Sequence, residues 1–244
     1  MFENINNLRK EVDKRRPLQP DLMNIIAQKF REEWTYHSNA IEGNTFTYRE
    51  TAFFLREGLT VKGKSLREHL EIVNHAEAID YLQEVIKDRD LTERFIKDMH
   101  AILFQGVRDI NFSPGDYKKE DNHVLTITGN IHQYTPAIHV SVEMEKLINW
   151  YNTQKITMHP IQLAAIFHHR LVAIHPFTDG NGRVSRLAMN LILMKNGFPP
   201  AIIRNENREE YYTALEQADH GDLQPIIDLV ATEVRNNLEL ILSA

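Results

Sequence analysis

The sequence predicts an all-α fold, a helical bundle that carries one small β-hairpin flap. Hydrophobic residues recur with helical spacing along most of the 244 residues. Two Ser/Thr-x-x-Glu segments, at residues 47–50 and 65–68, have the form of capping boxes that begin helices. One region, residues 122–135, is instead rich in β-branched residues around a Gly-Asn pair, which predicts a hairpin.

The helices are predicted from local patterns. Residues 21–35 place Leu22, Ile26 and Phe30 on one face of an amphipathic helix. Further helices are expected over about 48–56, 66–88, 92–105, 141–153, 160–173, 183–196, 207–220 and 223–242.

We expect one compact unit made of two parts. Residues 1–60 form an N-terminal helical segment, and residues 61–244 form the core domain. Residues 1–20 contain the basic run Lys14-Arg15-Arg16 and are expected to be a solvated lead-in.

Composition excludes several classes of protein. The net charge of -6 gives no support for non-specific nucleic-acid binding. The absence of cysteine rules out disulfides, thiol catalysis and Cys-type zinc sites. No stretch approaches the roughly 20 apolar residues of a membrane span, and the first residues lack the pattern of a secretory signal. We therefore expect a cytoplasmic protein with neither nucleic acid nor membrane as a partner.

Residues 175–186 combine several groups that suit phosphate chemistry. Gly180 and Gly182 can adopt backbone angles that expose consecutive N–H groups, which form a nest for an anion. Asp179 can hold Mg²⁺ through one carboxylate and leave other positions to phosphates. His175 titrates near neutral pH and can act as a general base.

Two arginines complete this segment. Arg183 begins the following helix, whose N-terminus attracts anions, and Arg186 lies three residues later on the same face. A Gly-Asn-Gly turn by itself is more often an ordinary loop between helices. Two guanidiniums beside such a turn require a negative partner, which favours nucleotide phosphates.

The run His-Pro-Phe-x-x-Gly-Asn-Gly-Arg-x-x-Arg at residues 175–186 resembles the signature of the Fic (Fido) family at every specified position. The resemblance extends over roughly residues 30–235. It implies a Fic-type helical bundle that transfers AMP from ATP to a Ser, Thr or Tyr hydroxyl of a target protein. It also implies that Mg²⁺, or Mn²⁺, accompanies the ATP.

The resemblance further implies a role for each residue of the signature. His175 accepts the proton of the attacking hydroxyl, and Asp179 holds the metal ion between the α- and β-phosphates. Arg183 takes the β-phosphate and Arg186 the γ-phosphate. The phosphates are cradled by the backbone of Gly180, Asn181 and Gly182, with the Asn181 side chain as an additional donor.

A segment near residues 207–222 resembles the part of the family that lines the adenine pocket. Tyr211 and Tyr212 are candidates for contact with the base, but neighbours on a helix point about 100° apart and cannot both face it. Ordinary half-buried packing is an equally good interpretation of either tyrosine. Asp219 stands where some relatives have asparagine, so its contact with adenine loses the amide donor.

A second motif lies N-terminal to the core. Ser38 and Glu42 are four residues apart, hence on one helix face, and Gly43 is suited to end that helix. Without context, a solvated helix terminus would be the better interpretation. The segment resembles the Ser/Thr-x-x-x-Glu-Gly inhibitory motif of the family (class II type), which implies that Glu42 forms a bidentate pair with Arg186 and keeps the γ-phosphate out. In some relatives this glutamate also supports removal of AMP, which stays open here.

The predicted flap, residues 122–135, has the position of the family's target-docking hairpin. The resemblance implies that residues around Leu125–Gly129 dock an extended segment of the target protein by strand addition. The binding-site residues expected in the flap are Thr126, Ile127, Thr128 and Gly129. Lys118 replaces the arginine of the family's lead-in, a departure expected to matter little if its contact is peripheral. Self-modification and a homodimer are further expectations from the family.

Two other functions stay open. One is a catalytically silent nucleotide-binding or scaffold module with a permanent Glu42–Arg186 pair; the presence of His175 and Asp179 argues against it, because binding alone needs neither. The other is a Fic enzyme that transfers a different phosphate-containing group; the intact Gly-Asn-Gly turn argues against it. A transcription regulator would need a DNA-binding domain, and residues 198–244 are too short to supply one.

Overall fold

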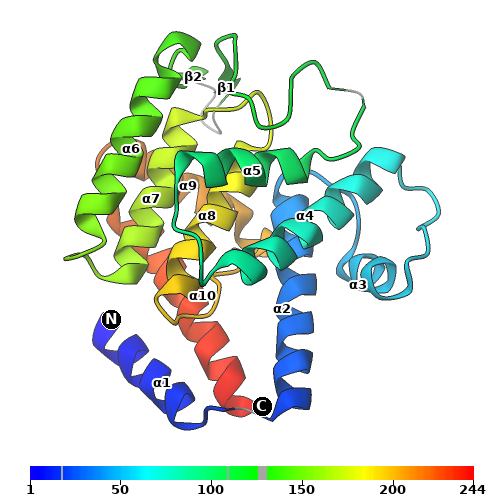
Figure 1. Ribbon diagram of the computed structural model, residues 1–244, viewed down its shortest axis with the longest axis vertical. Coiled ribbons are helices and arrows are strands. Elements are labelled where there is room, and N and C mark those ends of the chain that lie inside the picture. The colour runs from blue at the N-terminus through cyan, green and yellow to red at the C-terminus, as the bar shows by residue number, and fades with distance from the viewer. Residues whose placement is uncertain (18, 109, 126–130) are drawn as a thin grey trace.

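The computed structural model describes residues 1–17, 19–108, 110–125 and 131–244 (Figure 1). The helices in these ranges are α1 (Phe2–Lys14), α2 (Pro20–Ile41), α3 (Tyr48–Glu57), α4 (Leu66–Val85), α5 (Glu93–Leu103), α6 (Val140–Gln154), α7 (Pro160–Ile174), α8 (Asn181–Lys195), α9 (Arg208–Asp219) and α10 (Gln224–Ser243). Short 3₁₀ helices span Ala137–His139 and Asn205–Asn207. Strands β1 (His123–Leu125) and β2 (Ile131–Gln133) pair antiparallel, with Val124 opposite His132.

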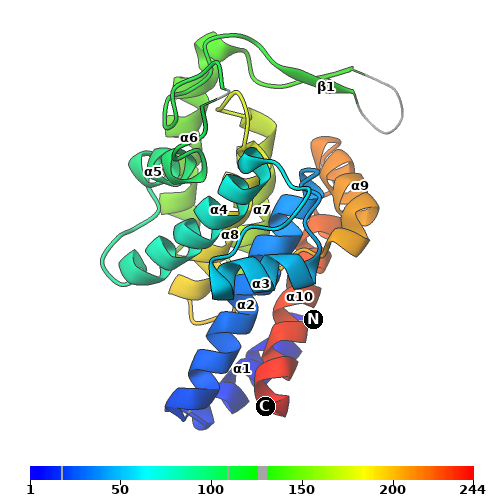
Figure 2. The ribbon, with the colours of Figure 1, turned by 90° about the vertical axis from the view of Figure 1, so that its right-hand side faces the viewer.

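This architecture confirms the predicted all-α fold. Helices α7 and α8 form the centre and pack against each other. Helices α2, α4 and α5 pack against α8, and α6, α9 and α10 pack against α7 (Figures 1 and 2). Helix α8 is buried through most of its length, as shown by Leu187 and Leu191 at 0% exposure. Because α8 is closely packed by its neighbours, the turn that precedes it has little freedom to move.

Both predicted capping boxes are present. Thr47 accepts a hydrogen bond from the Glu50 backbone N–H, and the Glu50 carboxylate accepts one from the Thr47 N–H at 2.8 Å. Ser65 and Glu68 repeat the arrangement at the start of α4. Local side-chain chemistry therefore determines where α3 and α4 begin.

The N-terminal region differs from its prediction. Residues 2–14 are not a solvated lead-in but helix α1, which packs against α10. Ile5 and Val12, seven residues apart and so on one helix face, are almost completely buried. Helix α2 joins the predicted amphipathic segment at residues 21–35 to the helix end expected at Gly43, and it ends at Ile41 near the centre of the molecule.

The predicted hairpin is present as β1 and β2, and it projects from the helical body (Figure 2). Thr126, Ile127, Thr128 and Gly129 lie outside the described residues. The lead-in to β1 is anchored to the body, because the Lys118 N–H donates to the Pro176 carbonyl at 2.9 Å.

Candidate functional site

The turn between α7 and α8 is held in a specific shape. His175 follows α7 in the left-handed region, with φ 51° and ψ 60°, which is uncommon for a residue with a side chain. Asn181 closes the turn: its Oδ1 accepts from the Phe177 N–H and its Nδ2 donates to the Phe177 carbonyl, both at 2.8 Å. These hydrogen bonds fix the backbone of the turn that follows His175.

Side chains from several elements hold the imidazole of His175. Its Nδ1 lies 2.8 Å from Nδ2 of Asn122 and 3.0 Å from Nδ2 of Asn181. The ring of Tyr134, just after β2, stacks on it at 3.8 Å between centroids. Burial, together with the nearby carboxylates of Asp219 and others, raises the pKa of Tyr134 to about 12, so this ring stays neutral.

Lys118, which stands where the family has arginine, does not make a peripheral contact. The expectation that this difference matters little depended on a peripheral contact and therefore does not apply. Its side chain is buried, and its Nζ lies 2.5 Å from Oδ1 of Asn122. Because Asn122 also contacts His175, the ammonium is linked to the imidazole through one amide. Burial lowers the pKa of Lys118.

The N-terminus of α8 is suited to an anion. Gly180 caps it with φ 78°, as predicted, and within the described chain no side chain caps this end. The N–H groups of the first turn are therefore available to a ligand.

Gly182 differs from its prediction, because it lies inside the first turn of α8 and has no positive φ. Its missing Cβ matters for another reason. A Cβ at this position would collide with Oε1 of Glu42 and lie 3.0 Å from Nη1 of Arg186. Glycine here lets the end of α2 approach α8 closely.

Arg186 is almost fully buried and contacts the predicted partner. Its Nη2 donates to Oε1 of Glu42 and to the Ser38 carbonyl, both at 2.8 Å. Its Nε donates to Oγ of Ser38 at 3.0 Å. Glu42 contacts Arg186 as expected, but through one carboxylate oxygen and not as a bidentate pair. The other two hydrogen bonds of the guanidinium go to Ser38. Burial lowers the pKa of Arg186, but the Glu42 carboxylate together with Tyr211 and Tyr212 more than offsets this, and the net pKa is raised.

Glu42 is positioned by the way α2 ends. It occupies the C-cap, and Gly43 follows at φ 95°. The Gly43 N–H donates to the Ala40 carbonyl at 3.0 Å, and the Asn44 N–H to the Asn39 carbonyl at 3.1 Å. These two bonds form a Schellman motif, in which glycine avoids the strain of the left-handed residue.

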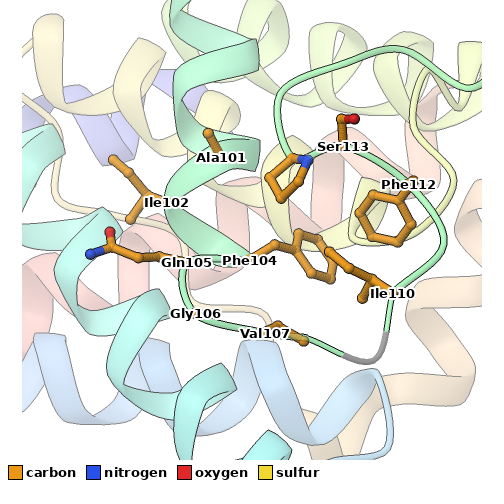
Figure 3. Close-up of a pocket in the computed structure, with 10 residues that line it drawn as sticks. Ala101, Ile102, Phe104, Gln105, Gly106, Val107, Ile110, Phe112 and Ser113 are labelled. Carbon is orange, nitrogen blue, oxygen red and sulfur yellow. The ribbon is translucent and has the colours of Figure 1, made fainter.

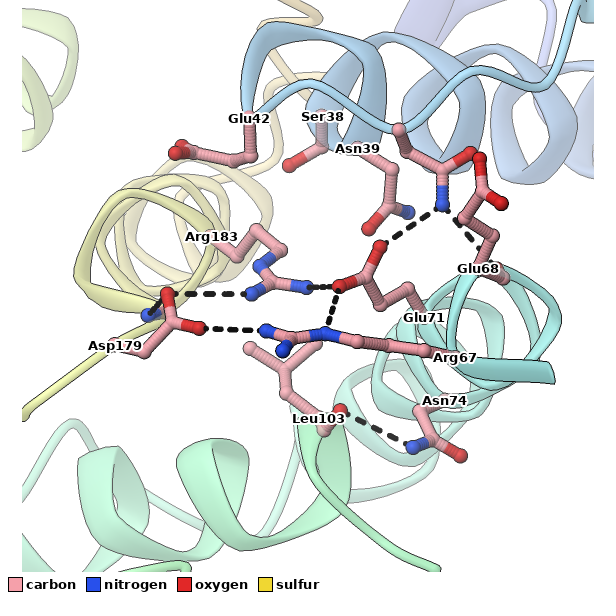
Figure 4. Close-up of polar contacts among 12 residues, drawn as sticks. Ser38, Asn39, Glu42, Arg67, Glu68, Glu71, Asn74, Leu103, Asp179 and Arg183 are labelled. Atoms are coloured by element: carbon pink, nitrogen blue, oxygen red, sulfur yellow. Dashed lines mark hydrogen bonds and ion pairs between the residues drawn. The ribbon is translucent and has the colours of Figure 1, made fainter. Parts of the chain in front are cut away.

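Asp179 and Arg183 belong to a second cluster of charges (Figure 4). Oδ1 of Asp179 lies 3.7 Å from Nη2 of Arg183, and its Oδ2 lies 3.1 Å from Nη2 of Arg67. Oε1 of Glu71 lies 3.3 Å from Nε of Arg67 and 3.7 Å from Nη1 of Arg183. The sequence analysis found neither Arg67 nor Glu71, because both lie in an ordinary helical segment.

His100, on α5, contacts the α7–α8 turn and was also not predicted from the sequence. Its Nδ1 accepts from the Gly115 N–H at 2.8 Å, and its Nε2 lies 3.1 Å from the Asp179 carbonyl. Its ring stacks on Phe177 at 3.9 Å. Burial lowers the pKa of His100 to about 4, so it is neutral at physiological pH and can accept at one nitrogen and donate at the other.

The candidate adenine residues are not equivalent. Tyr211 is buried, and its hydroxyl lies 2.9 Å from Nε2 of His168, so its ring belongs to the core rather than to an accessible wall. Tyr212 is half-buried, with the Arg208 guanidinium 5.2 Å from its ring centre. Asp219 contacts Nε2 of His169 through Oδ1 at 2.8 Å.

A separate pocket of about 560 Å³ lies between the end of α5 and the chain that follows it (Figure 3). Apolar side chains such as Ile110 and Phe112 line it, and none of the predicted site residues does. Two of its rings contact residues around the site: Phe104 lies 5.2 Å from the Arg183 guanidinium, and Phe112 lies 5.7 Å from the ring of His100. The pocket therefore offers no group for the chemistry at His175.

Among the described residues, no group of three or more His, Asp or Glu side chains is arranged to hold a metal ion. None of the described helices is both long and apolar enough to cross a membrane.

Comparisons with known proteins identify one family. A sequence model of the Fic/DOC family matches residues 90–193. The chain is 38% identical over 216 residues to protein adenylyltransferase Fic of Nematostella vectensis, and 35% identical over 217 residues to protein adenylyltransferase fic-1 of Caenorhabditis elegans. These matches cover 86% of this chain but 48% and 41% of the relatives, so the chain spans less than half of either.

A solved structure is similar over nearly the whole chain. It is a Fic domain containing signaling protein from Bacteroides thetaiotaomicron VPI-5482, with a TM-score of 0.93 and 32% sequence identity. The alignment covers 98% of this chain and 96% of that one.

Proposed function

The chain belongs to the Fic/DOC family, and on that premise we propose that it is a protein adenylyltransferase, which transfers AMP from ATP to a hydroxyl group of a target protein. The observation that carries the proposal is the α7–α8 turn. It places an imidazole, a helix N-terminus without a side-chain cap and two buried guanidiniums within residues 175–186. The curated relatives named above are adenylyltransferases by name.

Each residue of the turn has a role in this reaction. His175 accepts the proton of the target hydroxyl as its oxygen attacks the α-phosphorus and pyrophosphate leaves. The amides of Asn122 and Asn181 hold the imidazole in place. Arg183 and the N–H groups of α8 bind the phosphates, and their fixed positions favour the transition state, because no solvent must reorganise around the developing charge.

The residues present suit a divalent cation at Asp179. The Asp179 carboxylate is 43% exposed and directly precedes the N-terminus of α8, which no side chain caps in the described chain, so a cation that carries phosphates can reach it. A single carboxylate is typical of Mg²⁺ sites in which phosphates and water supply the other ligands. When bound there, the cation would neutralise charge on the α- and β-phosphates.

We propose that the Glu42–Arg186 contact inhibits the enzyme. Arg186 is the residue assigned to the γ-phosphate, and its guanidinium makes three hydrogen bonds of 2.8–3.0 Å to α2. A γ-phosphate must compete with these bonds, each of which involves a charged group and contributes about 1.5–3 kcal/mol. With the γ-phosphate displaced, the α-phosphorus is misaligned for attack.

We propose that the target segment docks on the hairpin at residues 122–135. A two-stranded sheet leaves backbone groups of each outer edge available for a further strand. Val124 is exposed in β1 and can contact a side chain of the added segment.

Intact-mass spectrometry after incubation with ATP and Mg²⁺ tests the proposal, with the protein itself and a cell lysate as targets. We expect Glu42→Gly to add the mass of AMP, wild type to add little, and the double variant Glu42→Gly, His175→Ala to add none. If none of the three labels any target although ATP binds, the chain is a nucleotide-binding module instead.

A further inference from the structure

Arg67, the second residue of α4, contacts the carboxylate that the proposed function assigns to the cation. Its Nη2 lies 3.1 Å from Oδ2 of Asp179, and its Nε lies 3.3 Å from Oε1 of Glu71 (Figure 4). The contact with Asp179 spans 112 residues of sequence. Arg67 is not part of residues 175–186, and the reaction as described above gives it no role.

The four side chains of this cluster balance one another. Arg67 and Arg183 supply two positive charges, and Glu71 and Asp179 supply two negative charges. A divalent cation at Asp179 would end this balance, because Arg67 would lose its carboxylate to an ion of higher charge. An anion must therefore arrive with the cation, and Arg67 is placed to meet it.

A nucleotide phosphate is an anion whose oxygens fit this position. Ligand oxygens lie about 2.1 Å from Mg²⁺ in an octahedron, so neighbouring ligands are about 3 Å apart. A phosphate oxygen that shares the cation with Oδ2 of Asp179 thus lies as close to this carboxylate as Nη2 of Arg67 lies now. The Arg67 side chain is 45% exposed and can turn toward such an oxygen without movement of α4.

We propose that Arg67 is a third phosphate-binding arginine, which pairs with Asp179 before nucleotide binds and turns to the β-phosphate when a cation takes Asp179. The inference rests on the proposed function, because its ligand is a magnesium complex of a nucleoside diphosphate or triphosphate. Arg67 would stabilise the pyrophosphate as it leaves, from the side of α4 that faces solvent.

Calorimetric titrations of the full chain with Mg·ADP and with AMP test this role, since only ADP has a β-phosphate. The variants are Arg67→Gln, which removes the charge, and Arg67→Lys, which keeps it but lacks the planar fork. Arg94→Gln is the matched control, because Arg94 also pairs with a carboxylate four residues later, Asp98, on α5.

We expect Arg67→Gln to raise the Kd for Mg·ADP about tenfold, as the loss of one charge-assisted hydrogen bond predicts. The Kd for AMP should change less than about twofold, Arg67→Lys should lie between Arg67→Gln and wild type, and Arg94→Gln should match wild type. An unchanged or lower Kd for Mg·ADP in Arg67→Gln, with wild type still binding, overturns the inference alone. Failure of wild type to bind either nucleotide overturns the proposed function as well.

Discussion

Arg183 and Arg186 lie one turn apart on α8 and are equally buried, but the protein holds them differently. Arg186 makes three hydrogen bonds of 2.8–3.0 Å to α2. Arg183 has ion pairs of 3.7 Å to Glu71 and Asp179, and its Nε has no partner among the described residues. Burial alone therefore does not prevent an arginine from binding a ligand. A guanidinium with loose ion pairs keeps hydrogen-bonding capacity for a ligand, whereas one held by short bonds must first be released.

The largest expected effect comes from neutralising one carboxylate partner of each arginine, Glu42 for Arg186 and Glu71 for Arg183. Glu42→Gln should raise the rate of AMP transfer at least tenfold, because a charged hydrogen bond to Arg186 is weakened. Glu71→Gln should change the rate by less than about threefold, because its ion pair with Arg183 is long. Time courses of labelling by intact mass measure both, and equal changes in the two variants would contradict the distinction.

A Ser38 variant tests how much the hydrogen bonds from Arg186 to Ser38 contribute to inhibition, in addition to the contact with Glu42. Ser38→Ala removes the Oγ acceptor of Nε but keeps the backbone carbonyl. We expect AMP transfer to rise by about threefold to tenfold, as loss of one hydrogen bond predicts. The same labelling assay applies, and a rate equal to that of wild type would show that Glu42 acts alone.

A Gly182 variant tests whether the missing Cβ makes room for the Glu42 side chain, and the measured quantity is the free energy of unfolding. In wild type, Gly182→Ala should lower the free energy of unfolding by about 1–3 kcal/mol, because its Cβ displaces the Glu42 carboxylate and weakens its hydrogen bond to the buried Arg186. In a Glu42→Gly background the same change should stabilise the helix by up to about 1 kcal/mol, since alanine favours helix over glycine. Urea unfolding of the four proteins measures the coupling. The same sign in both backgrounds would contradict it.

The last test concerns the dependence of stability on pH and the histidine that contacts the Asp179 carbonyl. His100 has its pKa lowered to about 4 by burial, whereas the unfolded chain binds that proton near the ordinary value of 6.5. The unfolded state thus holds more protons between these values, and stability falls as the pH is lowered from 6.5 toward 4. The contribution is at most about 1.4 kcal/mol per pH unit. Urea unfolding at several pH values should show a shallower slope for His100→Gln, and an unchanged slope would contradict the assignment.

Features that depend on neighbouring residues were predictable from the sequence. The capping boxes that start α3 and α4 lie within four residues each, and the glycine that ends α2 directly follows Glu42. The pair of Glu42 with Arg186 joins residues 144 apart, and it was predicted only because each side has a recognisable motif.

Contacts without a motif on both sides were missed. Arg67 meets Asp179 over 112 residues, His100 meets it over 79, and neither stands in a pattern that differs from an ordinary amphipathic helix. The role of Lys118 likewise depends on Asn122, which contacts His175 across 53 residues. Such contacts depend on how helices pack, and packing is decided by the whole core rather than by any one segment.

The central claim is that Glu42 and the γ-phosphate compete for Arg186. Titrations with Mg·ATP and Mg·ADP in a His175→Ala background, where no turnover interferes, compare proteins with and without Glu42→Gly. The account predicts nearly equal affinity for the two nucleotides while Glu42 is present, and a preference of about tenfold for ATP once it is removed. A ratio of ATP to ADP affinity that is the same in both proteins would contradict it.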